Sequence, residues 1–175
     1  MRTMNAIVAV DLHWGIGKDH KLLYRLPEDM HYFRAKTLDQ TVVCGRKTLE
    51  SFPDQKPLPR REHIVLSRTQ NREMSGVRFV KGLDELSLIL KGIPTGKVWI
   101  IGGESVYRQL YRHCENIYVT KIFADSVVPD TYFPNLDQDP HFSLKDATTC
   151  QTAQNGLKFQ FQIYQNKNVL PLFSR

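Results

Sequence analysis

The stretch Leu22–Arg34, with the sequence LLYRLPEDMHYFR, contains the clearest helix start in this chain of 175 residues. Pro27 suits the first helical position, because proline lacks only an N–H that the helix cannot use there. Asp29 falls in the first turn, and Phe33 and Thr37 follow at helical spacing. Residues four apart share a helix face, so the Asp29 carboxyl lies beside the Phe33 ring. If that face is buried, a carboxylic acid stands against an apolar wall; if it is exposed, the acid only favours the helix dipole.

Short apolar, β-rich runs alternate with helical patterns around this stretch. We expect strands over 5–12, 41–44, 63–67, 77–81, 98–101 and 116–122, helices over 27–37, 49–52, 84–91 and 104–113, and an antiparallel pair over 141–145 and 157–165. Strands alternating with helices predict a largely parallel sheet covered on both faces. We therefore predict a single-domain α/β fold over residues 1–166, with a mostly parallel central sheet of about eight strands, an antiparallel C-terminal strand pair and about four helices. Residues 167–175 are predicted to be a C-terminal tail.

Glycines follow three of the expected strands, at Gly15-Ile16-Gly17, Gly45-Arg46 and Gly102-Gly103. The first lies in a loop over 13–20, which we expect to be flexible and to expose Trp14 and Ile16. In parallel sheets, ligands bind outside the carboxyl ends of the strands, where these loops would gather. Glycine permits close approach of the backbone, and the free N–H groups of a helix start attract anions. A Gly-Gly pair alone is more often a simple tight turn.

Cations and hydroxyl groups stand beside these glycines. Arg46-Lys47-Thr48 follows Gly45, and Ser67-Arg68 ends the next strand. Arginine binds phosphate through its planar fork, lysine acts as a point charge, and threonine donates from its hydroxyl. Three such loops at consecutive strand ends favour a cofactor with several phosphates, one of them on a ribose 2′ position. The chain has neither a full GxGxxG nor a Walker loop, so an ordinary dinucleotide fold or an NTPase finds no support.

Asp29 and Arg61 supply the remaining chemistry. Desolvation raises the pKa of a carboxyl buried on an aromatic wall, and such a group can bind a protonatable heterocycle. Arg61 follows the proline-stiffened segment 57–59 and can clamp a carboxylate bidentately. A ligand with a basic ring at one end and a carboxylate at the other would meet both.

The charge balance is basic, with 24 Lys and Arg against 18 Asp and Glu, a formal net charge of +6. These basic residues are scattered along the chain, which weighs against nucleic-acid and membrane binding. The three cysteines are odd in number and lack metal or redox spacing, as expected of free thiols in a reducing cytosol. No secretory leader or membrane-spanning run is recognisable. We expect a cytoplasmic monomer that binds no metal, nucleic acid or membrane.

These segments together resemble the dihydrofolate reductases of the bacterial chromosomal type over residues 4–166. The resemblance is carried, in the family's order and spacing, by 14–18, 26–34, 45–52, 57–61, 101–107, 118–120 and 130–134. It implies a dihydrofolate reductase-like fold and the NADPH-dependent reduction of 7,8-dihydrofolate to 5,6,7,8-tetrahydrofolate, in support of one-carbon metabolism and thymidylate synthesis. In this reaction hydride goes to C6 and a proton to N5.

The resemblance also implies roles for individual residues. Asp29 is the ionisable catalytic residue, with Tyr24 and Leu22 beside it, and Arg61 rather than Arg60 holds the glutamate α-carboxylate. The substrate residues are Ile7, Val8, Asp29, Met30, Phe33, Arg34, Phe52, Leu58, Arg61, Ile101 and Thr120. The cofactor residues are Ala9, Ile16, Gly17, Gly45, Arg46, Lys47, Thr48, Leu66, Ser67, Arg68, Lys81, Gly102, Gly103, Glu104, Ser105, Val106 and Tyr107. Arg46, Ser67 and Arg68 resemble the group that favours NADPH over NADH, and a cis bond is expected at Gly102–Gly103.

The chain departs from the family pattern at two positions. Most bacterial members have a tryptophan that holds an active-site water where this chain has Tyr24, and a glycine where it has Pro129. That glycine belongs to a loop that supports a lid, which is Ile16–Leu22 here, so lid closure is expected to differ.

Two other functions remain alternatives to dihydrofolate reduction. The first is a related reductase acting on another pterin or on a riboflavin-pathway pyrimidine, against which the Phe33–Arg61 pair argues. The second is a non-catalytic nucleotide- or RNA-binding module that uses the +6 charge.

Overall fold

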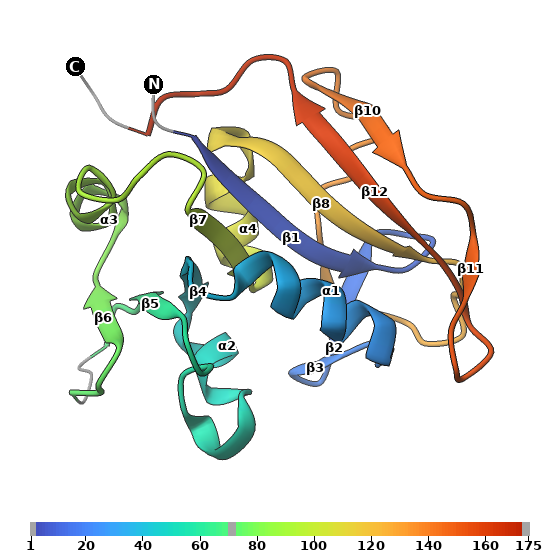
Figure 1. Cartoon of the computed structure of the whole chain (residues 1–175), viewed down its shortest axis with the longest axis horizontal. Helices are drawn as coiled ribbons and strands as arrows, with labels where there is room; N and C mark the ends of the chain where they lie inside the picture. The colour runs from blue at the N-terminus through green and yellow to red at the C-terminus, as the bar shows by residue number, and fades with distance from the viewer. Residues whose placement is uncertain (1–2, 70–72, 173–175) are drawn as a thin grey trace.

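A central sheet with helices on both faces organises the computed structural model, which describes residues 3–69 and 73–172 (Figure 1). The strands of this sheet are β1 (Met4–Val10), β4 (Thr41–Gly45), β5 (Glu62–Leu66), β6 (Val77–Val80), β7 (Val98–Gly102), β8 (Cys114–Ile122), β10 (Phe142–Ala147), β11 (Gln151–Thr152) and β12 (Lys158–Asn166). The helices are α1 (Pro27–Thr37), α2 (Arg46–Glu50), α3 (Leu83–Leu90) and α4 (Glu104–Leu110), with 3-10 turns η1 (Pro53–Gln55) and η2 (Tyr111–His113).

The strand order is β10-β12-β8-β1-β7-β4-β5-β6, with β11 paired to β12. Pairing is parallel from β8 across to β6, whereas β12 runs antiparallel to β8 and β10 antiparallel to β12. The predicted fold is therefore confirmed. β1 lacks clean alternation because it is covered on both sides: Ala6, Ile7 and Val8 are all buried.

Each face of the sheet has its own apolar cluster. α3 and α4 pack one face through Leu86 and Leu110, together with Val8 of β1. On the other face, the α1 ring of Phe33 packs with Ile7 of β1. The carboxyl ends of the parallel strands therefore open at one edge, between α1 on one side and the α4 start on the other.

A second, small sheet closes that edge. It consists of β2 (Gly15–Lys18) between β3 (Lys21–Leu22) and β9 (Thr131–Tyr132). β9 lies in the connector between β8 and β10. The backbone N–H of Asp130 donates to the Gly17 carbonyl, and the N–H of Asp19 donates to the Asp130 carboxylate. The lid is thus fastened by the loop that carries Pro129.

The prediction that Trp14 and Ile16 are exposed was wrong, because Trp14 is 3% and Ile16 9% exposed. The Asp11 carboxylate accepts hydrogen bonds from the N–H groups of His13 and Gly15, both at 2.8 Å, and turns the chain back on itself. Trp14, with φ of 63°, then packs edge-on against Tyr164 at a centroid distance of 5.7 Å.

Two other boundaries differ from expectation. α2 begins at Arg46 rather than at Leu49, directly after β4. Residues 167–172 continue along the molecule: the N–H of Leu170 donates to the Arg112 carbonyl, and Leu172 packs against the core. The division between 1–166 and 167–175 stays a prediction, and 173–175 lie outside the described residues. Within the described ranges, no helix is long and apolar enough to cross a membrane.

Gly15 has no room for a side chain, since a Cβ there would overlap Cγ of Pro129. We expect Gly15→Ala to lower the free energy of unfolding by about 1–3 kcal/mol, the usual cost of overpacking. The double variant Gly15→Ala, Pro129→Gly should recover most of this loss, because the ring is gone. Urea denaturation of the two single variants and the double variant gives the coupling. Equal losses in the single Gly15 variant and the double variant would contradict the contact.

Candidate active site

A carboxyl group from α1 meets a hydroxyl from β8 at the open edge of the sheet. The hydroxyl of Thr120, which is fully buried, donates to Asp29 Oδ1 at 2.6 Å. Thr120 pairs in register with Ala9 of β1, so the acid lies over the ends of β1 and β8. The helix face that carries Asp29 is therefore turned inward, and the alternative of an exposed acid does not hold.

Burial changes the acidity of this carboxyl. Desolvation raises the pKa of Asp29 above its ordinary value, and the hydrogen bond from Thr120 opposes the shift without cancelling it. The charge of Asp29 also affects Tyr32. The pKa of Tyr32 rises to about 12, mainly because of burial and then because of the charges of Tyr118 and Asp29. This agrees with the raised pKa expected from the sequence.

Apolar side chains with exposed surface flank Asp29. Leu22 is 61% and Met30 44% exposed. Phe33 is half-buried one turn further along α1, and Phe52 and Leu58 are half-buried in the segment after α2. The set can cover a flat aromatic ligand whose polar edge reaches Asp29.

Arg61 stands at the other end of the Asp29 face of α1. Its Nε donates to Thr37 Oγ1 at 3.3 Å and its Nη1 to the Pro59 carbonyl at 3.0 Å. The guanidinium carbon lies 6.0 Å from the centre of the Phe33 ring. Partial burial and the nearby charge of Arg34 lower the pKa of Arg61 without removing its charge at neutral pH.

The neighbouring arginine is already engaged. Arg60 donates to both carboxylate oxygens of Asp39. Arg61 has no ion-pair partner among the described residues. A carboxylate ligand would therefore find Arg61 available, and the choice of Arg61 over Arg60 stays a prediction.

The glycine-containing loops that follow β4 and β7, which the sequence suggested for phosphate binding, lie close together. α2 begins after Gly45 and α4 after Gly103, and no side chain caps either start. A Cβ on Gly103 would stand 3.5 Å from Thr48 Oγ1, and one on Gly45 would stand 3.4 Å from a Val106 methyl group. The expected cis bond at Gly102–Gly103 is present. These uncapped N–H groups and the Thr48 hydroxyl suit a diphosphate.

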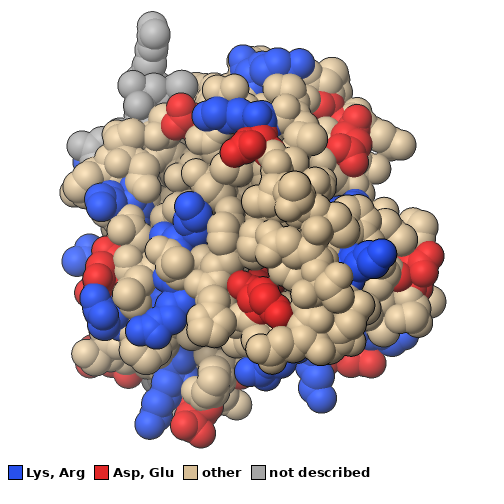
Figure 2. All heavy atoms as spheres, turned by 45° about the vertical axis from the view of Figure 1, so that its right-hand side comes forward, with Lys and Arg blue, Asp and Glu red and all other residues tan. Residues whose placement is uncertain are grey.

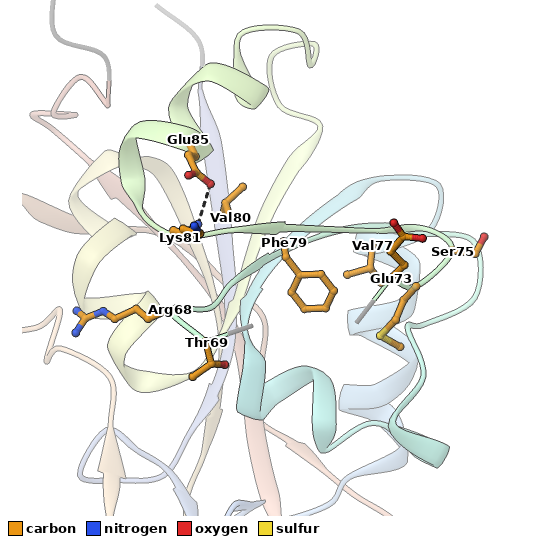
Figure 3. Close-up of a pocket in the computed structure, with 10 residues that line it drawn as sticks. Arg68, Thr69, Glu73, Ser75, Val77, Phe79, Val80, Lys81 and Glu85 are labelled. Atoms are coloured by element: carbon orange, nitrogen blue, oxygen red, sulfur yellow. Dashed lines mark hydrogen bonds between the residues drawn. The ribbon is translucent and has the colours of Figure 1, made fainter. Parts of the chain in front are cut away.

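Two cations border a hollow of about 870 Å³ beside β6. Arg68 and Lys81 lie on the same side of it, and Thr69 lies below them in the view of Figure 3. The Ser67 hydroxyl is 3.1 Å from that of Thr69. Glu73 and Glu85 line the same hollow, and Glu85 accepts from the Lys81 N–H, so the side with Arg68, Ser67 and Thr69 is the one that suits a further phosphate. With this side and the loops at Gly45 and Gly103, the residues present fit a cofactor such as NADPH.

Comparisons with known proteins agree with this geometry. The family model described as "Dihydrofolate reductase" matches residues 3–166. This chain belongs to the dihydrofolate reductase family. The dihydrofolate reductase of Bacillus subtilis (strain 168) is 31% identical over 162 residues, which cover 93% of this chain and 94% of that protein. That of Sus scrofa is 33% identical over 188 residues, covering 96% and 100%. The dihydrofolate reductase type 9 of Escherichia coli is 32% identical, covering 96% of each.

Not all residues predicted from the family pattern have side chains on the same side of the sheet as Asp29. The side chain of Val8 packs in the α3–α4 cluster, on the opposite side of β1 from Ile7. Tyr107 is buried, and its hydroxyl donates to the Ile7 carbonyl at 2.7 Å. Arg46 is paired with Glu50 at 2.7 Å. Their assigned roles stay predictions.

Tyr24 differs most from what the dihydrofolate reductase pattern suggests. Its hydroxyl hydrogen-bonds to Ser126 Oγ at 3.0 Å and accepts from the N–H of Val127 at 3.2 Å. Both partners lie in the loop that leads to Asp130 and fastens the lid. The structure thus ties Tyr24 to lid support, a contact that nothing in the local sequence signals.

Asp29→Asn should stabilise the fold at neutral pH, because the amide avoids burying a charge yet still accepts from Thr120. The folded-state pKa of Asp29 is raised, so the wild-type carboxyl loses stability as the pH rises through that pKa. The free energy of unfolding of the variant, minus that of the wild type, should therefore grow from pH 4 to pH 8. The increase is about 1.4 kcal/mol for each unit by which folding raises the pKa of Asp29. Urea unfolding over this range measures it. Asp84→Asn, an exposed first-turn carboxyl of α3, is the control. A constant difference across the range would contradict the buried acid.

Proposed function

We propose that the chain reduces 7,8-dihydrofolate to 5,6,7,8-tetrahydrofolate with NADPH in the groove between Asp29 and Arg61. This reduction is the activity of the family to which the chain belongs. The proposal rests on half-buried Asp29, hydrogen-bonded to buried Thr120, at one end of the groove and on the Arg61 guanidinium at the other.

α1 sets the spacing between these two groups. Arg61 bonds to Thr37, eight residues after Asp29, and eight residues of α-helix span about 12 Å. A flat heterocycle followed by an aromatic ring and a carboxylate matches such a span. Phe33 lies midway along the same face, where the rings of the ligand would stack.

Asp29 binds the polar edge of the pterin in this proposal. Thr120 occupies Oδ1, which leaves Oδ2 to accept from the ring N–H and amino group. A negative charge beside the ring makes N5 more basic and favours its protonation. Bound NADPH supplies the hydride for C6. Thr48, Arg68 and Lys81 would hold its phosphates, and Ile16 and Gly17 of β2 would exclude water from the nicotinamide end.

A related reductase acting on a pterin or pyrimidine without a carboxylate tail is the nearest alternative. Arg61, held over Phe33 by two hydrogen bonds, would have no ligand group to bind in that case. An RNA-binding module would present a continuous basic surface. On the face in Figure 2, Lys and Arg are dispersed among acidic and neutral residues.

We also infer that the chain acts as a monomer in the cytoplasm, with 1–166 as the reductase domain and 167–175 as a tail. Two buried thiols, Cys44 and Cys114, and one exposed thiol, Cys150, support a reducing compartment. Size-exclusion chromatography coupled to light scattering tests the oligomeric state.

Asp29→Asn should cut turnover with dihydrofolate severely at pH 7 and less at acid pH, where the substrate is already protonated. The loss is expected to be at least about 100-fold, the range of general acid–base effects. NADPH oxidation is followed by absorbance from pH 5 to pH 8, with Asp84→Asn as control. Full activity of the Asp29 variant at pH 7 would falsify the assigned role.

Arg61→Met should raise the KM for dihydrofolate about 10–100-fold with little change in kcat, since a charged hydrogen-bonded pair is lost. Arg60→Met is the matched control and should leave KM near the wild-type value, because Arg60 is engaged by Asp39. A dihydropterin without the aminobenzoylglutamate tail should show no effect of either variant. Equal KM values for the two arginine variants would refute the assignment of Arg61.

A further inference from the structure

His63 is the second residue of β5 and lies just behind the groove. It is 1% exposed, and both ring nitrogens are engaged. The N–H of Leu58 donates to Nε2 at 3.1 Å, and Nδ1 lies 3.0 Å from the Arg61 carbonyl oxygen. A backbone N–H can only donate and a carbonyl can only accept, so Nε2 is bare and Nδ1 carries the proton. The ring is therefore neutral and held in one tautomer.

Through these two hydrogen bonds, the His63 ring bridges Leu58 at one end of the turn and Arg61 at the other. Pro57 and Pro59 have no N–H to offer, and Arg60 has a positive φ of 58°, so the backbone has few means of holding this turn. The outer part is fastened to the α1–β4 connection, where the N–H of Asp39 donates to the Arg60 carbonyl. The inner part, which carries Leu58, is held by the His63 ring.

Uncharged side chains surround the ring on the neighbouring elements. Val42 of β4 and Val77 of β6 are its partners in register, and the Phe52 ring meets it edge-on at 6.1 Å. The charged groups that act on it are Arg61 and Glu62. Burial lowers the pKa of His63; the bond to the Arg61 carbonyl and the charge of Glu62 oppose this, while the Arg61 charge adds to it.

Protonation would change this arrangement in a definite way. An Nε2–H would point at the Leu58 N–H, donor against donor, and the hydrogen bond would be replaced by repulsion. A positive ring would also stand next to the Arg61 guanidinium. The inner part of the turn would come free, and Leu58 with it.

We propose that neutral His63 is a positioning residue that sets the affinity for dihydrofolate by holding Leu58 and Arg61 against the tail of the substrate, and that its protonation releases them. The proposal rests on the proposed role of Arg61. It makes His63 a determinant of KM rather than of kcat, because the reacting edge of the pterin lies at the far end of α1.

Two variants separate the hydrogen bonds from the charge. An asparagine in His63→Asn can accept from Leu58 and donate to Arg61, yet it does not titrate. His63→Ala removes both bonds. KM and kcat for dihydrofolate are measured from pH 5 to pH 8 for both variants and the wild type. The same series is run with a dihydropterin that lacks the aminobenzoylglutamate tail.

We expect His63→Ala to raise the KM for dihydrofolate about tenfold at pH 7, with kcat within about twofold. The wild-type KM, divided by that of His63→Asn at each pH, should rise as the pH falls through the lowered pKa of His63. This ratio cancels the titrations of Asp29 and of the substrate, which both proteins share. For the truncated dihydropterin the ratio should stay constant. A constant ratio for dihydrofolate as well would overturn the proposal.

Long-range ¹H–¹⁵N NMR of the wild type gives a readout that needs neither turnover nor a folded alanine variant. We expect the Nδ1–H tautomer of His63 and a titration midpoint below the ordinary value of a histidine, because burial lowers the pKa of this ring. An Nε2–H tautomer or an ordinary midpoint would refute the proposal. If Arg61→Met leaves KM unchanged while the NMR result is as expected, the proposed function of Arg61 fails and the proposal on affinity fails with it, whereas the neutral His63 bridge stands.

Discussion

The burial of one carboxyl group is the constraint on which the rest of the site depends. Asp29 lies half-buried over the ends of β1 and β8, and it accepts one side-chain hydrogen bond, from the Thr120 hydroxyl at 2.6 Å. One neutral donor cannot replace the hydration of a carboxylate, so the ionised form is held at a cost that a bound heterocycle can relieve. The ligand thus completes a hydrogen-bonding arrangement that the folded chain leaves unfinished.

The topology of the sheet and the length of α1 place the other groups of the site relative to that carboxyl. Parallel strands bring the Gly45 and Gly102–Gly103 loops to the edge that α1 borders. The antiparallel β12 pairs with β8 along the stretch that contains Thr120. α1 then fixes how far Arg61 stands from Asp29. The segment Ile16–Leu22, which the family pattern implies to be a lid, belongs to a separate small sheet and not to the central one.

Local signals in the sequence were enough for the helix that carries Asp29, because Pro27 and helical spacing act within a few residues. They were enough for the sheet, since apolar β-rich runs recur between helices. The burial of Trp14 could not be found in this way. It depends on Asp11 folding the chain back and on Tyr164, which lies far along the sequence. The bridging position of His63 could not be found in this way either, because its partners come together only when the proline-rich turn closes.

The position of Trp14 bears on the fluorescence of the protein. The chain has two tryptophans, and Trp99 lies within the sheet while Trp14 stands at the root of the lid. The ammonium group of Lys121 lies 4.7 Å from the centre of the Trp14 ring, in an interaction that depends on the ring's exact orientation. Any movement of the chain around Trp14 changes the electric field that the Lys121 ammonium group exerts on the indole. The emission of Trp14 is therefore a built-in reporter of lid opening, and its time course can be recorded without attaching a dye.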